Sequence, residues 1–121
     1  MGKYVLAVDD SKTMRDMVSF TLRGAGYTVL EAEHGVAALK VLQGQKVDVI
    51  ITDVNMPEMD GITLVRKVRA LSTQVGTPIL ILTTESDQGK KDEGRAAGAT
   101  GWIVKPFSPD KLLQIVAKVC P

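Results

Sequence analysis

The fold is decided by residues 47–57, which read VDVIITDVNMP. The β-branched apolar run ends abruptly in Asp53 and is followed by turn residues, a pattern typical of a strand buried on both faces. Pro57 cannot extend a ladder and disfavours helical backbone at Met56, so we predict that the strand ends near Asp53. In open α/β sheets, ligands bind beyond the carboxyl ends of the strands. Asp53 is thus either a turn cap or part of a site.

Composition indicates one globular domain over residues 1–121. The chain is 45% hydrophobic and 24% charged, with a net charge of +1, which gives no sign of nucleic-acid binding. The single cysteine, Cys120, excludes an internal disulfide, fits a reducing cytosol and is expected to be a partly exposed bystander. No apolar run approaches the roughly 20 residues of a membrane span, and the N-terminus reads as a strand and not a signal peptide. We therefore expect a cytoplasmic protein without membrane contact.

Strand-like and helix-like segments alternate along the whole chain. The predicted strands are residues 4–8, 28–32, 47–53, 78–82 and 102–104, and the predicted helices are 14–25, 36–42, 62–71, 87–98 and 109–119. Such alternation is typical of an α/β fold, a doubly wound parallel sheet of five strands covered on both faces by five helices. The alternation does not by itself set the strand order.

Several polar residues away from the strand ends are predicted to have no role in a site. His34 is predicted to be a solvated turn residue, because it has no cysteine or histidine partner that would suggest a metal site. Arg66, Lys67 and Arg69 are predicted to form a solvated helix face. Segment 87–98 carries three glycines and few large apolar residues, so it is expected to be the weakest helix.

Chemically distinctive residues follow four of the five predicted strands. They are Asp9, Asp10, Asp53, Thr83 and Lys105. In a parallel sheet these ends meet at one edge, where clustered carboxylates repel one another and favour a hard divalent cation such as Mg²⁺. A carboxylate nucleophile, a cation, a hydroxyl donor and a metal together indicate phosphoryl transfer to an aspartate. Unrelated turn caps and a surface lysine are the simpler alternative.

The motifs at these positions occur in a known order. VDDS at 8–11, DVNMP at 53–57, DG at 60–61, Thr83 and KPF at 105–107 resemble the receiver domain of two-component signalling. The chain is similar, over essentially its whole length, to a stand-alone CheY-like response regulator. The resemblance implies a flavodoxin/CheY-like sheet with strand order 2-1-3-4-5.

The resemblance also implies roles for individual residues. Asp53 is expected to take the phosphoryl group from a phosphohistidine of a CheA-like sensor histidine kinase. Asp10, Asp53 and the backbone carbonyl of Asn55 are expected to ligate Mg²⁺, with Asp9 acting through water. Lys105 is expected to pair with the phosphate, and its bond to Pro106 is expected to be cis.

The expected output is a change of surface and not catalytic turnover. Thr83 is expected to turn toward the phosphoryl group, and Trp102, where the family commonly has Tyr or Phe, is the candidate aromatic switch. The altered face of helix 4, strand 5 and helix 5 would bind a protein partner such as the flagellar motor switch. Asn55 and Glu85 each lie two residues beyond a site residue and are expected to control slow autodephosphorylation. We expect a monomer that acts in chemotaxis.

Other functions compete with this reading. A metal-dependent phosphatase with an aspartate nucleophile would have a second aspartate where Asn55 stands, and an amide cannot supply the proton. A flavodoxin-like binding module would need a phosphate-cradling loop where Asp9 and Asp10 would repel a phosphate. A phosphorelay intermediate, or a receiver fragment of a multidomain regulator such as a transcription factor, stays open.

Overall fold

The structure, a computed structural model, describes residues 3–71, 74, 76–84 and 88–120. All ten predicted elements are present, with small differences at their ends. The strands are β1 (Tyr4–Val8), β2 (Thr28–Ala32), β3 (Val49–Asp53), β4 (Ile79–Thr84) and β5 (Gly101–Lys105). The helices are α1 (Lys12–Gly24), α2 (Gly35–Gly44), α3 (Gly61–Arg69), α4 (Gln88–Ala97) and α5 (Pro109–Val119).

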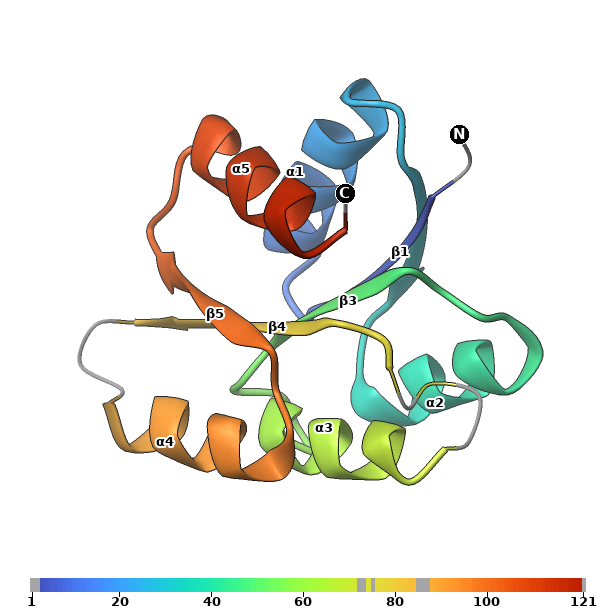
Figure 1. Cartoon of the computed structure of the whole chain (residues 1–121), viewed down its shortest axis with the longest axis vertical. Helices are drawn as coiled ribbons and strands as arrows, with labels where there is room; N and C mark the ends of the chain where they lie inside the picture. The colour runs from blue at the N-terminus through green and yellow to red at the C-terminus, as the bar shows by residue number, and fades with distance from the viewer. Residues whose placement is uncertain (1–2, 72–73, 75, 85–87, 121) are drawn as a thin grey trace.

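The strands form one parallel sheet in the order β2-β1-β3-β4-β5. Figure 1 shows helices α1 and α5 on one face of this sheet and α2, α3 and α4 on the other. The predicted doubly wound architecture and strand order are therefore confirmed. Because every strand runs the same way, the ends of β1, β3, β4 and β5 lie along one edge.

Strand β3 lies at the centre of the sheet, and all five of its residues are buried. Ile50 joins the core cluster that includes Leu64 of α3, while Ile51 joins the cluster on the opposite face that includes Leu112 of α5. The alternation of the strand sends successive side chains into the two cores. The strand ends at Asp53, as predicted, and begins at Val49, two residues later than predicted.

Side-chain caps fix where four of the helices begin. Ser11, His34, Asp60 and Ser108 each accept a hydrogen bond from the backbone N–H three residues later. Serine, the residue at two of these positions, is among the commonest helix N-caps. His34 was not predicted as a cap: its Nδ1 atom accepts from the N–H of Ala37 at 3.1 Å, so it starts α2.

Two of the surface predictions are wrong. Arg69 is not part of a solvated face: its guanidinium donates to the backbone carbonyls of Gly98, just after α4, and of Gln74 and Thr77 in the segment between α3 and β4. Cys120 is 8% exposed and packs in the core beneath α1 and α5.

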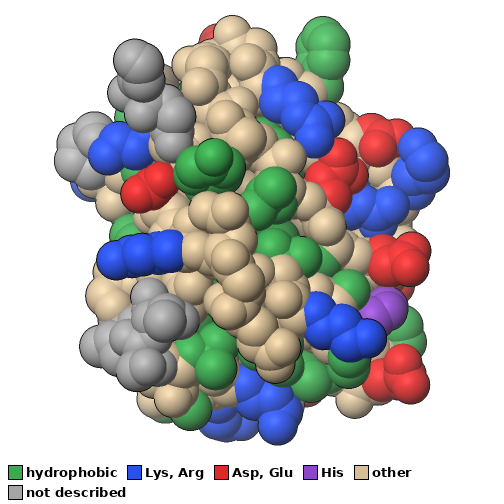
Figure 2. Space-filling model, turned by 90° about the vertical axis from the view of Figure 1, so that its right-hand side faces the viewer, with side chains coloured by type: hydrophobic (Ala, Val, Ile, Leu, Met, Phe, Trp, Pro, Cys, Tyr) green, Lys and Arg blue, Asp and Glu red, His purple; other side chains and the backbone are tan. Residues whose placement is uncertain are grey.

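Charges of both signs are interspersed on the surface seen in Figure 2, in keeping with the formal net charge of +1. In the parts of the chain that the structure describes, none of the helices combines the length and hydropathy needed to cross a lipid bilayer.

Candidate functional site

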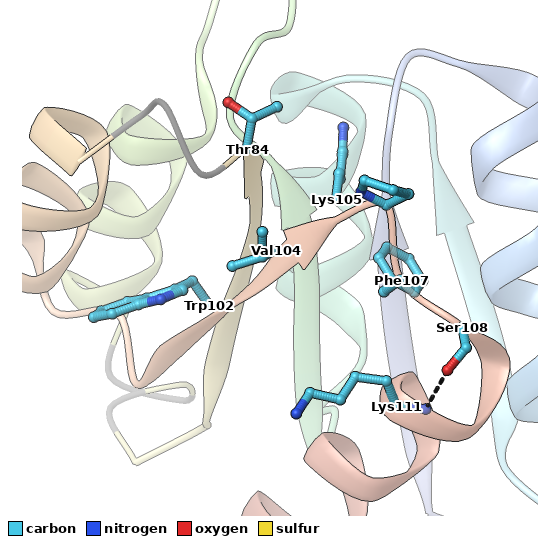
Figure 3. Close-up of a pocket in the computed structure, with 8 residues that line it drawn as sticks. Thr84, Trp102, Val104, Lys105, Phe107, Ser108 and Lys111 are labelled. Atoms are coloured by element: carbon cyan, nitrogen blue, oxygen red, sulfur yellow. Dashed lines mark hydrogen bonds between the residues drawn. The ribbon is translucent and has the colours of Figure 1, made fainter.

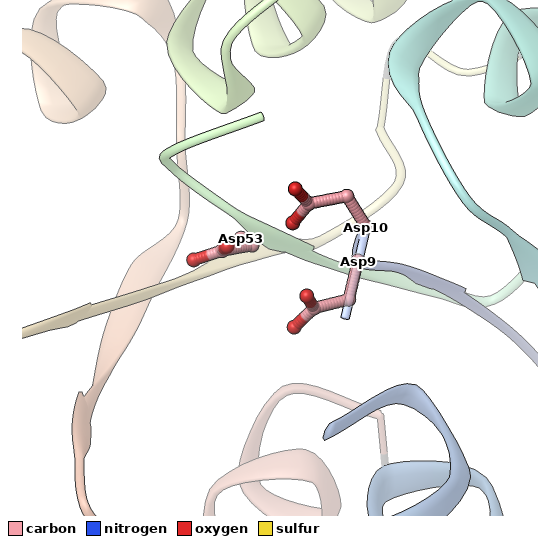
Figure 4. Close-up of side chains that lie close together, drawn as sticks. All are labelled: Asp9, Asp10 and Asp53. Carbon is pink, nitrogen blue, oxygen red and sulfur yellow. The ribbon is translucent and has the colours of Figure 1, made fainter. Parts of the chain in front are cut away.

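Three carboxylates gather at the sheet edge that the sequence singled out. Asp9 and Asp10 follow β1, and Asp53 ends the adjacent strand β3. Each offers one oxygen, and these oxygens lie within 4.8 Å of one another. Figure 4 shows the three side chains close together at the strand ends. Asp9 and Asp53 are buried, whereas Asp10 is exposed, so the cluster opens to solvent on one side.

Asp9 is the most buried member of this cluster. Its Oδ1 atom accepts from the N–H of Ser11 at 2.9 Å, while its buried Oδ2 atom has no hydrogen-bond partner among the described residues. Burial raises the pKa of the Asp9 carboxyl; the Ser11 hydrogen bond opposes this, and the nearby Asp53 carboxylate adds to it. A buried oxygen without a partner is costly unless a cation or a water satisfies it.

Asp53 is paired with a lysine that comes from a strand two places away. The Nζ atom of Lys105, at the end of β5, lies 2.8 Å from Oδ1 of Asp53, so its side chain reaches past the end of β4. The same Oδ1 atom accepts from the N–H of Val54 at 2.9 Å. The bond between Lys105 and Pro106 is cis, as the resemblance implied.

Three further residues were predicted to act at this site, and the structure describes two of them. Thr83 is buried on β4, between the strands that carry Asp53 and Lys105, and its hydroxyl donates to the carbonyl of Thr84 at 3.4 Å. Asn55 is exposed in the loop after β3. Glu85 lies outside the described residues. The roles assigned to these three residues stay predictions.

The donor set of the cluster fits a hard divalent cation. Three carboxylates within reach of one another supply the oxygen ligands that Mg²⁺ prefers, and the exposed side leaves room for water and a phosphate. A cation would also relieve the repulsion between the carboxylates and satisfy the orphaned oxygen of Asp9. Asp9, Asp10 and Asp53 are the residues that could hold it.

A cleft of about 750 Å³ lies beside the site, along β5 and the start of α5. Figure 3 shows Trp102, Val104, Lys105 and Phe107 along this cleft. Its lining residues are Thr84, Trp102, Val104, Lys105, Pro106, Phe107, Ser108 and Lys111. The cleft therefore joins the neighbourhood of Asp53 to the surface that carries the only tryptophan.

Trp102 is held against α4 by two cations that the sequence analysis did not identify. The guanidinium carbon of Arg95 lies 4.9 Å from the indole centroid, and the Nζ atom of Lys91 lies 5.6 Å from it. Contacts of this kind attract the cation to the ring face. The four-residue spacing of Lys91 and Arg95, which puts both on one face of a helix, was the available signal.

Known proteins are similar to this chain in sequence and in fold. The model of the response regulator receiver domain matches residues 5–117, so the chain belongs to the response regulator receiver family of two-component signalling. A chemotaxis protein CheY homolog of Campylobacter jejuni is 47% identical over 112 residues, covering 91% of this chain and 86% of the relative.

Solved structures of receiver-domain proteins also have this fold. The chemotaxis response regulator CheY4 of Vibrio cholerae is 53% identical, with a TM-score of 0.94 over 98% of this chain and 99% of that one. The receiver domain of a sensor histidine kinase from Pseudomonas aeruginosa, solved with a magnesium ion coordinated in the active site cleft, is 28% identical, with a TM-score of 0.91 over 99% of this chain and 98% of that one.

Proposed function

We propose that residues 1–121 form a single receiver domain that works as a CheY-like response regulator, accepting a phosphoryl group on Asp53 from a phosphohistidine of a sensor histidine kinase. The observation that carries the proposal is the 2.8 Å contact between Lys105 and Asp53 beside two further carboxylates. A buried carboxylate with a cation on one side and a metal-binding donor set on the other suits phosphoryl transfer better than a turn cap does.

Each residue of the site has a separate role in the phosphoryl transfer. A carboxylate oxygen of Asp53 forms the new bond to phosphorus as the bond from phosphorus to the kinase imidazole breaks, and the imidazole leaves with a proton. Lys105 then faces the phosphoryl oxygens, and the Thr83 hydroxyl donates to one of them. When bound, Mg²⁺ would supply positive charge beside the carboxylates and the phosphoryl oxygens. Asp10, Asp53 and the Asn55 carbonyl would hold it directly, and Asp9 would act through water.

The lifetime of the phosphorylated state is set by two residues that closely follow site residues in the sequence. Asn55 and Glu85 each lie two positions beyond a site residue, Asp53 and Thr83, where they can control the approach of water. Asn55 is exposed, which suits this role. The protein therefore catalyses only its own phosphorylation and slow dephosphorylation, and it is not a turnover enzyme.

The output is a change in the face formed by α4, β5 and α5. Phosphorylation adds about −1.5 to −2 charges next to Thr83, and the cleft beside β5 connects this position to Trp102. The altered face binds a downstream protein such as the flagellar motor switch. Support for chemotaxis comes from the Campylobacter and Vibrio relatives, which are named as chemotaxis proteins. We take the protein to be a cytoplasmic monomer.

A second role is a phosphorelay intermediate or the receiver of a multidomain regulator. The similarity to a receiver domain of a sensor histidine kinase supports this second role. A relay protein would pass its phosphoryl group on to a second histidine-containing protein. A switch would keep the group and bind its partner more tightly.

The proposal is tested by adding beryllofluoride and Mg²⁺ to the isotopically labelled protein and recording amide chemical shifts. We expect shifts at the ends of β1 and β3 and across α4, β5 and α5. Asp53→Asn is the matched control and should show no shifts beyond those that Mg²⁺ alone produces. Shifts confined to the carboxylate cluster would contradict the proposed output, and shifts that depend on beryllofluoride in Asp53→Asn would contradict the proposed acceptor.

A further inference from the structure

Arg15 occupies a position beside the carboxylate cluster that the proposed function does not use. It lies in the first turns of α1, four residues after the cap Ser11, and its side chain is 14% exposed. Its Nη1 atom donates to the backbone carbonyl of Asp9 at 2.7 Å. Its Nε atom pairs with Oε1 of Glu31 on the neighbouring strand β2 at 3.1 Å. The guanidinium thus links the end of β1 to the neighbouring strand β2.

The peptide groups of Asp9 are held from two sides as a result. Its N–H donates to the carbonyl of Ala32 at 3.1 Å, and its carbonyl accepts from Arg15. The planar guanidinium can hold the Asp9 carbonyl and the Glu31 carboxylate at once, in a fixed relative direction. Few arrangements of the short loop that carries Asp9 and Asp10 satisfy both anchors.

The loop needs such anchors because its carboxylates repel one another. With no cation bound, the exposed Asp10 side chain could lower the repulsion by moving away from Asp53, and the loop would move with it. The charges that act most strongly on the Asp9 carboxyl are those of Asp53, Lys105 and Asp10. The contact that Arg15 makes is to the Asp9 main chain and not to its carboxylate.

We infer that Arg15 is a positioning residue: through the Asp9 carbonyl it fixes the loop, so that Asp9 and Asp10 stay close to Asp53 and ready to receive a divalent cation. This inference rests on the proposed function, because it takes the cluster to be a Mg²⁺ site. Glu31 supports Arg15 by orienting the guanidinium from β2.

A matched control is available in Arg23. Its Nη2 atom pairs with Oε2 of the same Glu31 at 3.3 Å and donates to the carbonyl of Val29, so it also ties α1 to β2. It is 54% exposed and contacts Glu31 from the far end of the helix. If Arg15 only fastened the helix to the sheet, Arg15→Gln and Arg23→Gln would affect the Mg²⁺ site alike.

The test is a titration of the native protein, Arg15→Gln and Arg23→Gln with MgCl₂, followed by amide chemical shifts of Asp9, Asp10 and Ser11. We expect Arg15→Gln to raise the Mg²⁺ dissociation constant about tenfold, as removal of a group that orients a ligand does, and Arg23→Gln to change it less than twofold. Hydrogen exchange of the Ser11 amide, measured in EDTA, should accelerate only in Arg15→Gln. Should Arg15→Gln fail to fold, Arg15→Lys, which keeps the charge and loses the planar fork, is compared in the same way.

The outcomes distinguish a failure of the proposed function from a failure of this inference. Native protein that gives no saturable response to Mg²⁺ contradicts the proposed function and this inference with it. Native protein that binds Mg²⁺, with unchanged affinity and exchange in the Arg15 variant, overturns the inference alone. Equal weakening by the Arg15 and Arg23 variants also overturns it, since it would show a general effect of loosening α1.

Discussion

Lys105 and Asp53 end two strands that are separated by β4, and their side chains meet at 2.8 Å across the end of that strand. The Lys105 ammonium therefore compensates the charge of the Asp53 carboxylate. Removal of Lys105 should therefore change the stability of the protein even when no phosphoryl transfer takes place.

Lys105→Ala is expected to lower the free energy of unfolding by about 1–2 kcal/mol in EDTA at neutral pH, because it leaves the buried Asp53 carboxylate next to two others without its partner. Added Mg²⁺ should recover part of the loss. Urea unfolding measures both effects, with the exposed Lys111, at the other end of the same cleft, changed to alanine as the control. Equal losses from the two variants would show that the pair contributes nothing specific.

Asp9→Asn is expected to be more stable than the native protein at neutral pH in EDTA. Burial raises the Asp9 pKa above its ordinary value of 3.8. At a pH between 3.8 and the raised pKa, the folded chain therefore holds more protons than the unfolded chain. Stability contributed by this group therefore falls as the pH rises through that window. The gap between variant and native protein should close as the pH is lowered toward 3.8.

Urea unfolding at a series of pH values checks this prediction. Asp16→Asn, which neutralises an exposed carboxylate paired with Lys12, is the control. A native protein as stable as Asp9→Asn at neutral pH would show that the Asp9 carboxylate is not strained in the metal-free state.

Gly61→Ala is expected to destabilise the protein by about 1–3 kcal/mol and to weaken Mg²⁺ binding. A β-carbon on Gly61 would overlap the backbone oxygen of Asp53, and the Gly61 N–H donates to the carbonyl of Val54 at 2.8 Å. The start of α3 is thus built against the loop that carries the candidate acceptor. Gly44→Ala, in open space at the end of α2, should have little effect or stabilise slightly. Equal effects in the two variants would contradict the close approach.

Trp102 emission is expected to shift when beryllofluoride and Mg²⁺ are added, and not in Asp53→Asn. Because Arg95 and Lys91 lie over the indole, Arg95→Ala should change the resting spectrum and reduce the size of the shift. Lys90→Ala, on the same helix, is the control. A native spectrum that stays constant would indicate that Trp102 is a fixed packing residue and that the signal leaves by another route.

The sequence predicted those parts of the site that depend on strand ends. Asp9, Asp10, Asp53, Thr83 and Lys105 could be placed because parallel strands put all their carboxyl ends at one edge. The three carboxylates and Lys105 do lie together at this edge, whereas the direct contact between Lys105 and Asp53 was not predicted. The catalytic and metal-binding roles stay predictions.

The features that the sequence did not reveal depend on how helices pack against their neighbours. Arg15, Arg69 and the cations over Trp102 all read as ordinary helix-surface charges, because spacing within one helix does not show which carbonyl or ring lies opposite. Cys120 appeared peripheral because it lies one residue from the end of the chain, yet α5 carries it back into the core.

The central claim is that Asp53 accepts a phosphoryl group with the help of Mg²⁺, and intact mass after incubation with acetyl phosphate tests it most directly. The native protein should gain the mass of one phosphoryl group with Mg²⁺ and much less in EDTA, while Asp53→Asn should gain none. A mass gain that persists in Asp53→Asn, or that EDTA leaves undiminished in the native protein, would contradict the account.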